Sequence, residues 1–166
     1  LASTDLIMVG ALGALSIAAV SIFMQPRLIL LCFSRSLASS VTLLVSQKAG
    51  AGDTNGTSDI MKKSLTLCAI FMGLLHILFY IFLDDIFYLM GANDEYMAEA
   101  MAYGPIALAA VYVTSLTLIL QAVQLGYGRT SVIMKTNVCG NVVNLALNAL
   151  LIFGFGPIPS LGVTGA

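Results

Sequence analysis

The sequence predicts an all-α fold, a polytopic bundle of transmembrane helices, and three observations support this. Of 166 residues, 59% are hydrophobic and only 9% are charged, against about 25% in soluble domains. The mean hydropathy is +0.99. The uncharged segment Leu65–Leu83 would span roughly 28 Å as a helix, which matches the hydrocarbon core of a bilayer. This composition excludes a soluble enzyme, a basic nucleic-acid-binding face and a disordered tail.

The first fifty residues are expected to hold two membrane spans, the first of them truncated because the sequence opens inside an apolar stretch. Two candidate breaks separate these spans, and hydropathy does not choose between Gly10–Gly13 and Gln25–Arg27. A polar connection rich in Gly, Asn, Asp and Ser then runs over 47–59. Such residues favour turns over helix, so this connection is predicted to be non-helical.

Three further spans complete a predicted set of five. The third is Leu65–Leu83, the fourth is Met101–Val123, and the fifth runs from Val132 or Val138 to Phe153. Asp84 and Glu95 lie in the two acidic turns that bracket a short interfacial piece between the third and fourth spans.

The distribution of charge predicts the orientation of the chain in the membrane. Basic residues concentrate in the second-to-third and fourth-to-fifth loops, whereas the third-to-fourth loop carries five acids and no base. Because cytoplasmic loops are enriched in Lys and Arg, the two basic loops are expected to be cytoplasmic and the acidic loop external. Arg27 is the exception on the external side. The basic residues are Lys48, Lys62, Lys63, Arg129 and Lys135.

Polar residues recur on single faces of three predicted helices. Spacings of four and three residues align Asn137, Asn141, Asn144 and Asn148 within an arc of about 60°. Hydrogen bonding between helices would account for one such asparagine, but the whole row favours a surface facing a wet cavity. The fourth span repeats the pattern with Tyr103, Thr114, Thr117, Gln121 and Gln124, and the second with Arg35, Ser39, Thr42 and Ser46.

Asp5 is the one acid within the body of a predicted span. Burial in an apolar medium would raise the pKa of its carboxyl group, which could then exchange a proton or a sodium ion with the external side. Amide oxygens such as those of Asn144 and Asn148 could complete such a site. An interfacial position is the alternative for Asp5. For His76, a neutral buried ring bonded to backbone is favoured over a proton relay. Together, these features favour a transporter or channel.

The ordered motifs resemble those of the multidrug and toxic compound extrusion (MATE) family. They are Thr4–Gly13 with Ile17–Val20, Val45–Asp53, Leu89–Asn93 with Tyr103, Leu125–Thr130, Asn144–Gly154 and Leu161–Ala166. The resemblance implies that residues 1–166 form one partial MATE-type domain, the N-terminal lobe from a truncated first helix to just before the sixth helix. It also favours the break at Gly10–Gly13.

The resemblance further implies efflux of organic cations or xenobiotics in exchange for H⁺ or Na⁺. Ion coupling would use Asp5, Asn144 and Asn148, with Tyr103 nearby. The expected substrate path is lined by Asn137, Asn141, Thr114, Thr117, Gln121 and Arg35. No cofactor is expected beyond the coupling ion, and no metal beyond Na⁺ at Asp5. The expected partners are the lipid bilayer of the plasma or inner membrane, a cationic or amphiphilic small molecule and the C-terminal lobe, with no nucleic acid.

Beside a non-transporting structural membrane subunit, which the aligned polar rows argue against, two alternatives remain at this point. One is a flippase for lipid-linked saccharides from the same broader superfamily, which would need a more basic cavity than Arg35 alone provides. The other is a membrane-embedded transferase that holds Mg²⁺ through several aspartates. Asp84 and Asp85 have no third aspartate at the required spacing, so the chain is expected not to be an enzyme.

Overall fold

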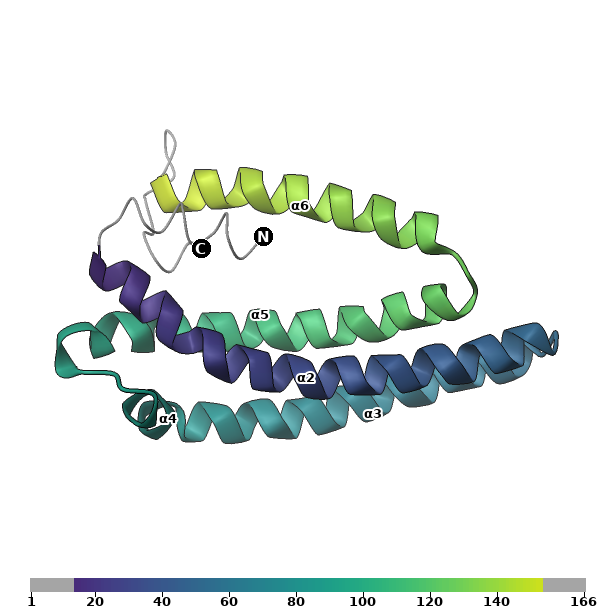
Figure 1. The fold of residues 1–166 in the computed structure, drawn as a ribbon, viewed down its shortest axis with the longest axis horizontal. Helices are drawn as coiled ribbons and strands as arrows, with labels where there is room; N and C mark the ends of the chain where they lie inside the picture. Colours follow the sequence, from purple (N-terminus) through teal and green to yellow (C-terminus); the bar gives the residue numbers. More distant parts are fainter. Residues whose placement is uncertain (1–13, 154–166) are drawn as a thin grey trace. The chain divides into compact units, whose positions relative to one another are not determined.

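The computed structural model describes residues 14–153, with side chains described except at 14–16, 19, 94–96 and 148–153. Over this range the structure consists of five α-helices and no strands (Figure 1). The all-α prediction is therefore confirmed. The helices are α2 (Ala14–Gly50), α3 (Thr54–Ile81), α4 (Leu83–Leu89), α5 (Asp94–Gly126) and α6 (Thr130–Phe153).

Three of these helices contain segments long and apolar enough to cross a membrane, namely Val20–Gly50, Thr54–Ile81 and Met97–Gly126. They correspond to the second, third and fourth predicted spans. Helix α6 forms over the fifth predicted span, but its described part carries Lys135 and three asparagines and is not among the three. The first predicted span lies outside the described residues.

Helix α2 continues through Pro26 without interruption. Of the two candidate breaks, the one at Gln25–Arg27 is therefore excluded, although Pro26 cannot donate a hydrogen bond to the carbonyl of Ile22. Membrane helices tolerate proline where surrounding groups satisfy the freed carbonyl, and Pro26 is buried. The alternative break at Gly10–Gly13 lies outside the described residues, directly before the first residue of α2. Helix α5 likewise contains a proline, Pro105.

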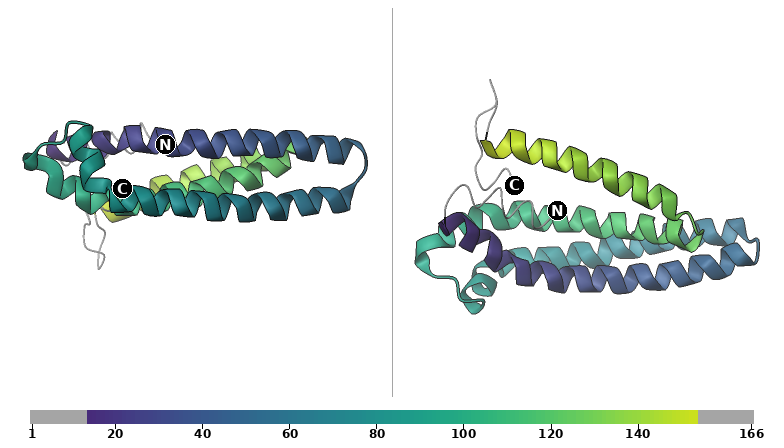
Figure 2. Two further views of the ribbon diagram at one scale, coloured as in Figure 1. Left: turned by 90° about the horizontal axis from the view of Figure 1, so that it is seen from below. Right: turned by 45° about the horizontal axis from the view of Figure 1, so that its top comes forward.

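The connection between α2 and α3 is shorter than predicted, because Thr54–Asp59 is helical rather than an extended turn. Gly52 adopts a φ of 73°, which reverses the chain at the end of α2. The Oδ1 atom of Asp53 then accepts a hydrogen bond of 2.8 Å from the backbone N–H of Gly56. This N-terminal cap compensates for the weak helix preference of the glycine and asparagine that follow. Figure 2 shows the resulting hairpin.

The chain divides into two compact units, which are considered separately. Among the described residues, unit 1 contains 14–26, 80–107 and 137–153, and unit 2 contains 27–79 and 108–136. In unit 1, the ring of Phe23 packs edge-on against Phe87 and Tyr103, with ring centroids 6.5 and 5.8 Å apart. Phe23 and Phe87 are almost completely buried, so contacts between aromatic rings form part of the core of this unit.

Unit 2 is built by three helices, α2, α3 and α5, around a core that contains polar groups. The Ser34 hydroxyl lies 2.7 Å from the Ser115 hydroxyl and 3.6 Å from Met72 Sδ, which joins all three helices. Near the end of α5, the Thr42 hydroxyl donates to the carbonyl oxygen of Ala122 at 3.2 Å. The serine pair is fully buried, so its hydrogen bond forms without competition from water, which strengthens it relative to a solvent-exposed pair.

The close approach of α2 and α5 depends on Gly126. A Cβ atom at this position would lie 2.6 Å from Val45 Cγ1 and 3.0 Å from the Thr42 carbonyl oxygen. We expect Gly126→Ala to destabilise the complete transporter by about 1–3 kcal/mol, because overpacking forces the two helices apart. Thermal unfolding in detergent measures this. Gly73→Ala is the control, since its Cβ would meet Tyr112 at an ordinary 3.8 Å. Equal stability of the two variants would contradict the prediction.

The Asp53 cap predicts a pH dependence of stability. The Gly56 N–H and the Lys48 ammonium group, 3.1 Å from Oδ2, hold the pKa of Asp53 below its usual value. The carboxylate therefore stabilises the folded state above about pH 4, and this contribution is lost as the pH falls through the lowered folded-state pKa.

Unfolding temperatures should thus differ between wild type and Asp53→Ala at pH 7 and converge in acid. Lys48→Met should keep most of the pH dependence, because the Gly56 bond is the larger cause. A difference between wild type and Asp53→Ala that is unchanged by acid would contradict this account.

Candidate functional site

The polar row predicted on α2 lies mostly outside the core of unit 2. Arg35, Ser39 and Ser46 are exposed, whereas Ser34 and Val41 on another face of the helix are buried. Thr42 is the exception, because its hydroxyl bonds to Ala122 and so joins α2 to α5. Arg35 and its serine neighbours are thus available to line a cavity, while Thr42 has a packing role.

The polar row of α5 is also directed away from the core of unit 2. Thr114 and Thr117 are exposed, and their hydroxyls bond back to the carbonyl oxygens of Ala110 and Val113 at 2.8 and 2.9 Å. Gln121 is half-buried. Because the two hydroxyls satisfy their donors within the helix, each keeps acceptor capacity on the exposed face.

The asparagine row of α6 is accessible over its described length. Asn137 and Asn141 are exposed and Asn144 is half-buried. The apolar residues between them, such as Val138 and Val142, are exposed as well. The described part of α6 from Asn137 to Leu147 therefore buries few side chains against the other described residues.

The structure describes three of the predicted ion-coupling residues to different extents. Asp5 lies outside the described residues. Asn148 falls within helix α6, four residues after Asn144, but its side chain is not described. Tyr103 is half-buried in unit 1, where its ring packs against Phe23.

His76 lies in unit 2, buried between helices α3 and α5. Its Nδ1 atom is 2.6 Å from the carbonyl oxygen of Met72. Because a carbonyl only accepts, Nδ1 carries a proton, and Nε2 has no partner among the described residues. The ring packs edge-on against Tyr112 at 5.5 Å. This arrangement is the backbone-bonded, buried histidine that the sequence favoured.

Sequence reasoning missed the buried polar cluster of unit 2. Ser34 and Ser115 are fully buried and hydrogen-bonded to each other, and Cys68 Sγ lies 3.7 Å from the Ser115 carbonyl oxygen. A search for rows of polar residues overlooks single serines inside apolar runs. The available signal was spacing: Ser34 follows Leu30 by four residues and precedes Val41 by seven, so it shares their buried face.

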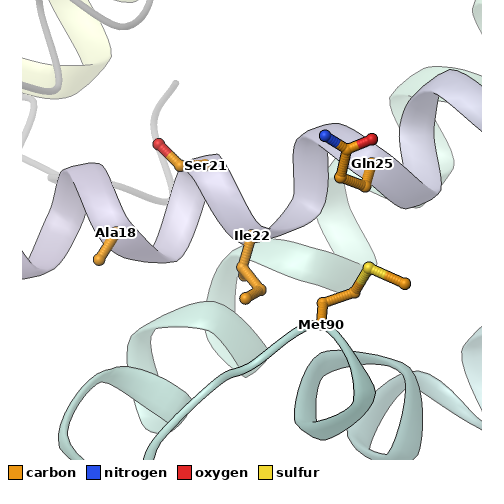
Figure 3. A pocket seen from close by; sticks show the side chains of 5 residues that line it. All are labelled: Ala18, Ser21, Ile22, Gln25 and Met90. Carbon is orange, nitrogen blue, oxygen red and sulfur yellow. The ribbon is translucent and has the colours of Figure 1, made fainter.

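Unit 1 contains an open pocket of about 310 Å³ on one face of α2. Ala18, Ser21, Ile22 and Gln25 line it from α2, and Met90 lines it from the turn after α4. Figure 3 shows the side chain of Ile22 directed toward the turn that carries Met90. The pocket thus combines an apolar wall with one hydroxyl and one amide group.

Comparison with known proteins identifies the family of this chain. The MatE family model matches residues 2–150. The chain belongs to the MatE family. A crystal structure of MATE in the bent conformation superimposes with a TM-score of 0.88 and 26% sequence identity, covering 98% of this chain and 35% of that one. The predicted family resemblance is confirmed.

Two curated relatives are transporters, as predicted, and not enzymes. A probable multidrug resistance protein, NorM of Rhizobium meliloti (strain 1021), is 30% identical over 99% of this chain. An FAD transporter of Shewanella oneidensis is 27% identical over 98% of this chain. The chain spans 35% of the first relative and 36% of the second, which is consistent with a second lobe elsewhere in a parent protein.

The exposed asparagine face of α6 predicts a pattern of thiol reactivity. Cysteines introduced at positions 141 and 144 of the complete transporter should react with a membrane-impermeant thiol reagent, because both positions share the polar face. The native Cys139 is exposed and lies about 160° around the helix from Asn141. Its reaction in the unmodified transporter is the control for labelling away from the polar face. Silence at both positions, together with reaction at 143 or 147, would assign the cavity to another face.

Proposed function

We propose that this chain forms the N-terminal part of a secondary active transporter that exports organic cations and xenobiotics by antiport with H⁺ or Na⁺. The observation that carries this proposal is the MatE match over 2–150, which includes the acidic first-helix motif and the asparagine row. The exposed polar rows of α2 and α5 support it, because a transporter needs a hydrated path beside apolar helices.

Coupling of the ion is proposed to use Asp5 together with Asn144 and Asn148, with Tyr103 close to the site. Helix α6 is continuous through Phe153, so a spacing of four residues puts the two asparagines on one face. A carboxylate that gains and releases a proton, or that binds Na⁺ with two amide oxygens, would supply the exchange. Because the side-chain amides of Asn144 and Asn148 do not titrate, Asp5 would be the one titratable group of the proposed site.

The proposed orientation puts the two basic loops in the cytoplasm of a cell whose plasma or inner membrane holds the protein. Within unit 2, Val45 of α2 lies beside Gly126 of α5, so the loops that follow α2 and α5 are at the same end. Lys48 and Arg129 belong to that end. Since α3 runs from this end to Ile81, the acidic residues Asp84 and Asp85 follow at the opposite end, and the positive-inside rule orients the unit.

The substrate class is the finer part of the proposal. One relative is named for multidrug resistance and another for FAD transport. The names of related proteins therefore refer both to drugs and to a large anionic nucleotide. Neither name favours a flippase for lipid-linked saccharides.

The coupling role of Asp5 is tested in the complete transporter. Asp5→Asn should reduce efflux driven by a pH or Na⁺ gradient by at least about tenfold, a loss equivalent to 1.4 kcal/mol, because an amide can neither titrate nor neutralise a cation. Everted vesicles loaded with separate gradients measure this and identify the ion. Asp59→Asn, which alters an exposed acid paired with Lys63, should retain efflux. Wild-type efflux in Asp5→Asn would remove Asp5 from the mechanism.

A further inference from the structure

Arg35 lies at the middle of the membrane-spanning part of unit 2. Its neighbour Ser34 contacts Met72 of α3. Met72 is roughly nine residues, or about 14 Å, from Lys63 in one direction and from Ile81 in the other. Lys63 forms an exposed ion pair with Asp59 and so marks the aqueous end of α3. Because the hydrocarbon core is about 30 Å thick, the level of Ser34 and Arg35 is its midplane.

The Arg35 side chain has no partner in the part of the chain that the structure describes. It is exposed, on a face of α2 that differs from the face carrying Ser34 and Val41 into the core. Neither a hydrogen bond nor an ion pair joins it to another described residue, whereas Lys48 and Lys63 both form ion pairs. Ser39, one turn further along the helix, is exposed on the same side.

A guanidinium group at this depth is costly in contact with lipid. Charged side chains inside membranes face water-filled cavities or pair with opposite charges. Within unit 2, the acids whose side chains the structure describes are Asp53 and Asp59. Both lie near the connection between α2 and α3, and neither is at the level of Arg35. Among the described residues of unit 2, that level therefore carries a single formal charge, and this charge is positive.

The geometry points to a binding site for an oxyanion. We propose that Arg35, assisted by the Ser39 hydroxyl, binds the carboxylate or phosphate group of the transported compound, so that among the proposed organic cations and xenobiotics the preferred substrates also carry an anionic group. A planar guanidinium offers paired N–H donors that match both groups, and the serine hydroxyl adds a donor one turn away. This inference rests on the proposed transport function and specifies its substrate class.

Two pairs of fluorescent probes test the proposal in the complete transporter. Norfloxacin and its methyl ester differ by a carboxylate charge, and flavin mononucleotide and riboflavin differ by a phosphate. Binding in detergent and efflux from cells are measured for wild type, Arg35→Gln and Arg35→Lys. Lys62→Gln is the matched control, because it removes an exposed positive charge from the basic end of α3.

In at least one pair, wild type should bind the compound with the carboxylate or phosphate group more tightly than the compound that lacks it. Arg35→Gln should weaken that binding by at least about tenfold and leave the partner unchanged. Arg35→Lys should be intermediate, since an ammonium group keeps the charge but loses the paired donors. Lys62→Gln should behave as wild type.

Three results would overturn the proposal. The first is an absence of preference for either charged probe in wild type. The second is a preference that survives Arg35→Gln. The third is an equal loss of binding for both members of a pair in Arg35→Gln, with binding recovered in Arg35→Gln/Asp5→Asn, which would assign Arg35 to an ion pair within the protein. Preferential, Arg35-dependent binding without gradient-driven efflux would support the anion site and reject the proposed transport function.

Discussion

The packing of unit 2 depends on the close contact between α2 and α5. Ser34 and Ser115 form a direct hydrogen bond within the buried core of the unit, and Gly126 allows the backbones to approach near the C-terminal ends of both helices. In lipid, helices gain little from hydrophobic burial, so small residues and interhelical hydrogen bonds supply the association. The direction of every other side chain on α2 follows from this contact, since turning Ser34 inward turns Arg35 outward.

Most of the fold could be predicted from hydropathy. The third and fourth spans fall within α3 and α5 because long uncharged runs have no other stable state in a bilayer. The ends of the helices were harder to predict. Hydropathy left a break at Gln25–Arg27 open, but α2 continues through Pro26. Composition also treats 54–59 as a turn, although the Asp53 side chain caps a helix there. Both differences arise from local hydrogen bonding that composition does not record.

The candidate site could be predicted in part, for a similar reason. Helical periodicity correctly separated Arg35 and Thr114 from the buried faces of their helices. It failed for Thr42, because a hydroxyl on the edge of a polar row can bond to a neighbouring helix as readily as to water. It also overlooked Ser115, whose burial follows from the position of α2 and cannot be read from α5 alone. Periodicity assigns a face to each residue, but the neighbouring helix decides what that face meets.

The two prolines lie close to two of the four positions where the chain passes from one unit to the other. Unit 1 ends at Pro26 on α2 and at Ala107 on α5, two residues after Pro105. A proline removes one backbone hydrogen bond from the helix that contains it, so bending there sacrifices less than bending elsewhere. The other two crossings, in α3 and α6, contain no proline. Two of the four helical connections between the units therefore each lack one backbone hydrogen bond at or near the crossing.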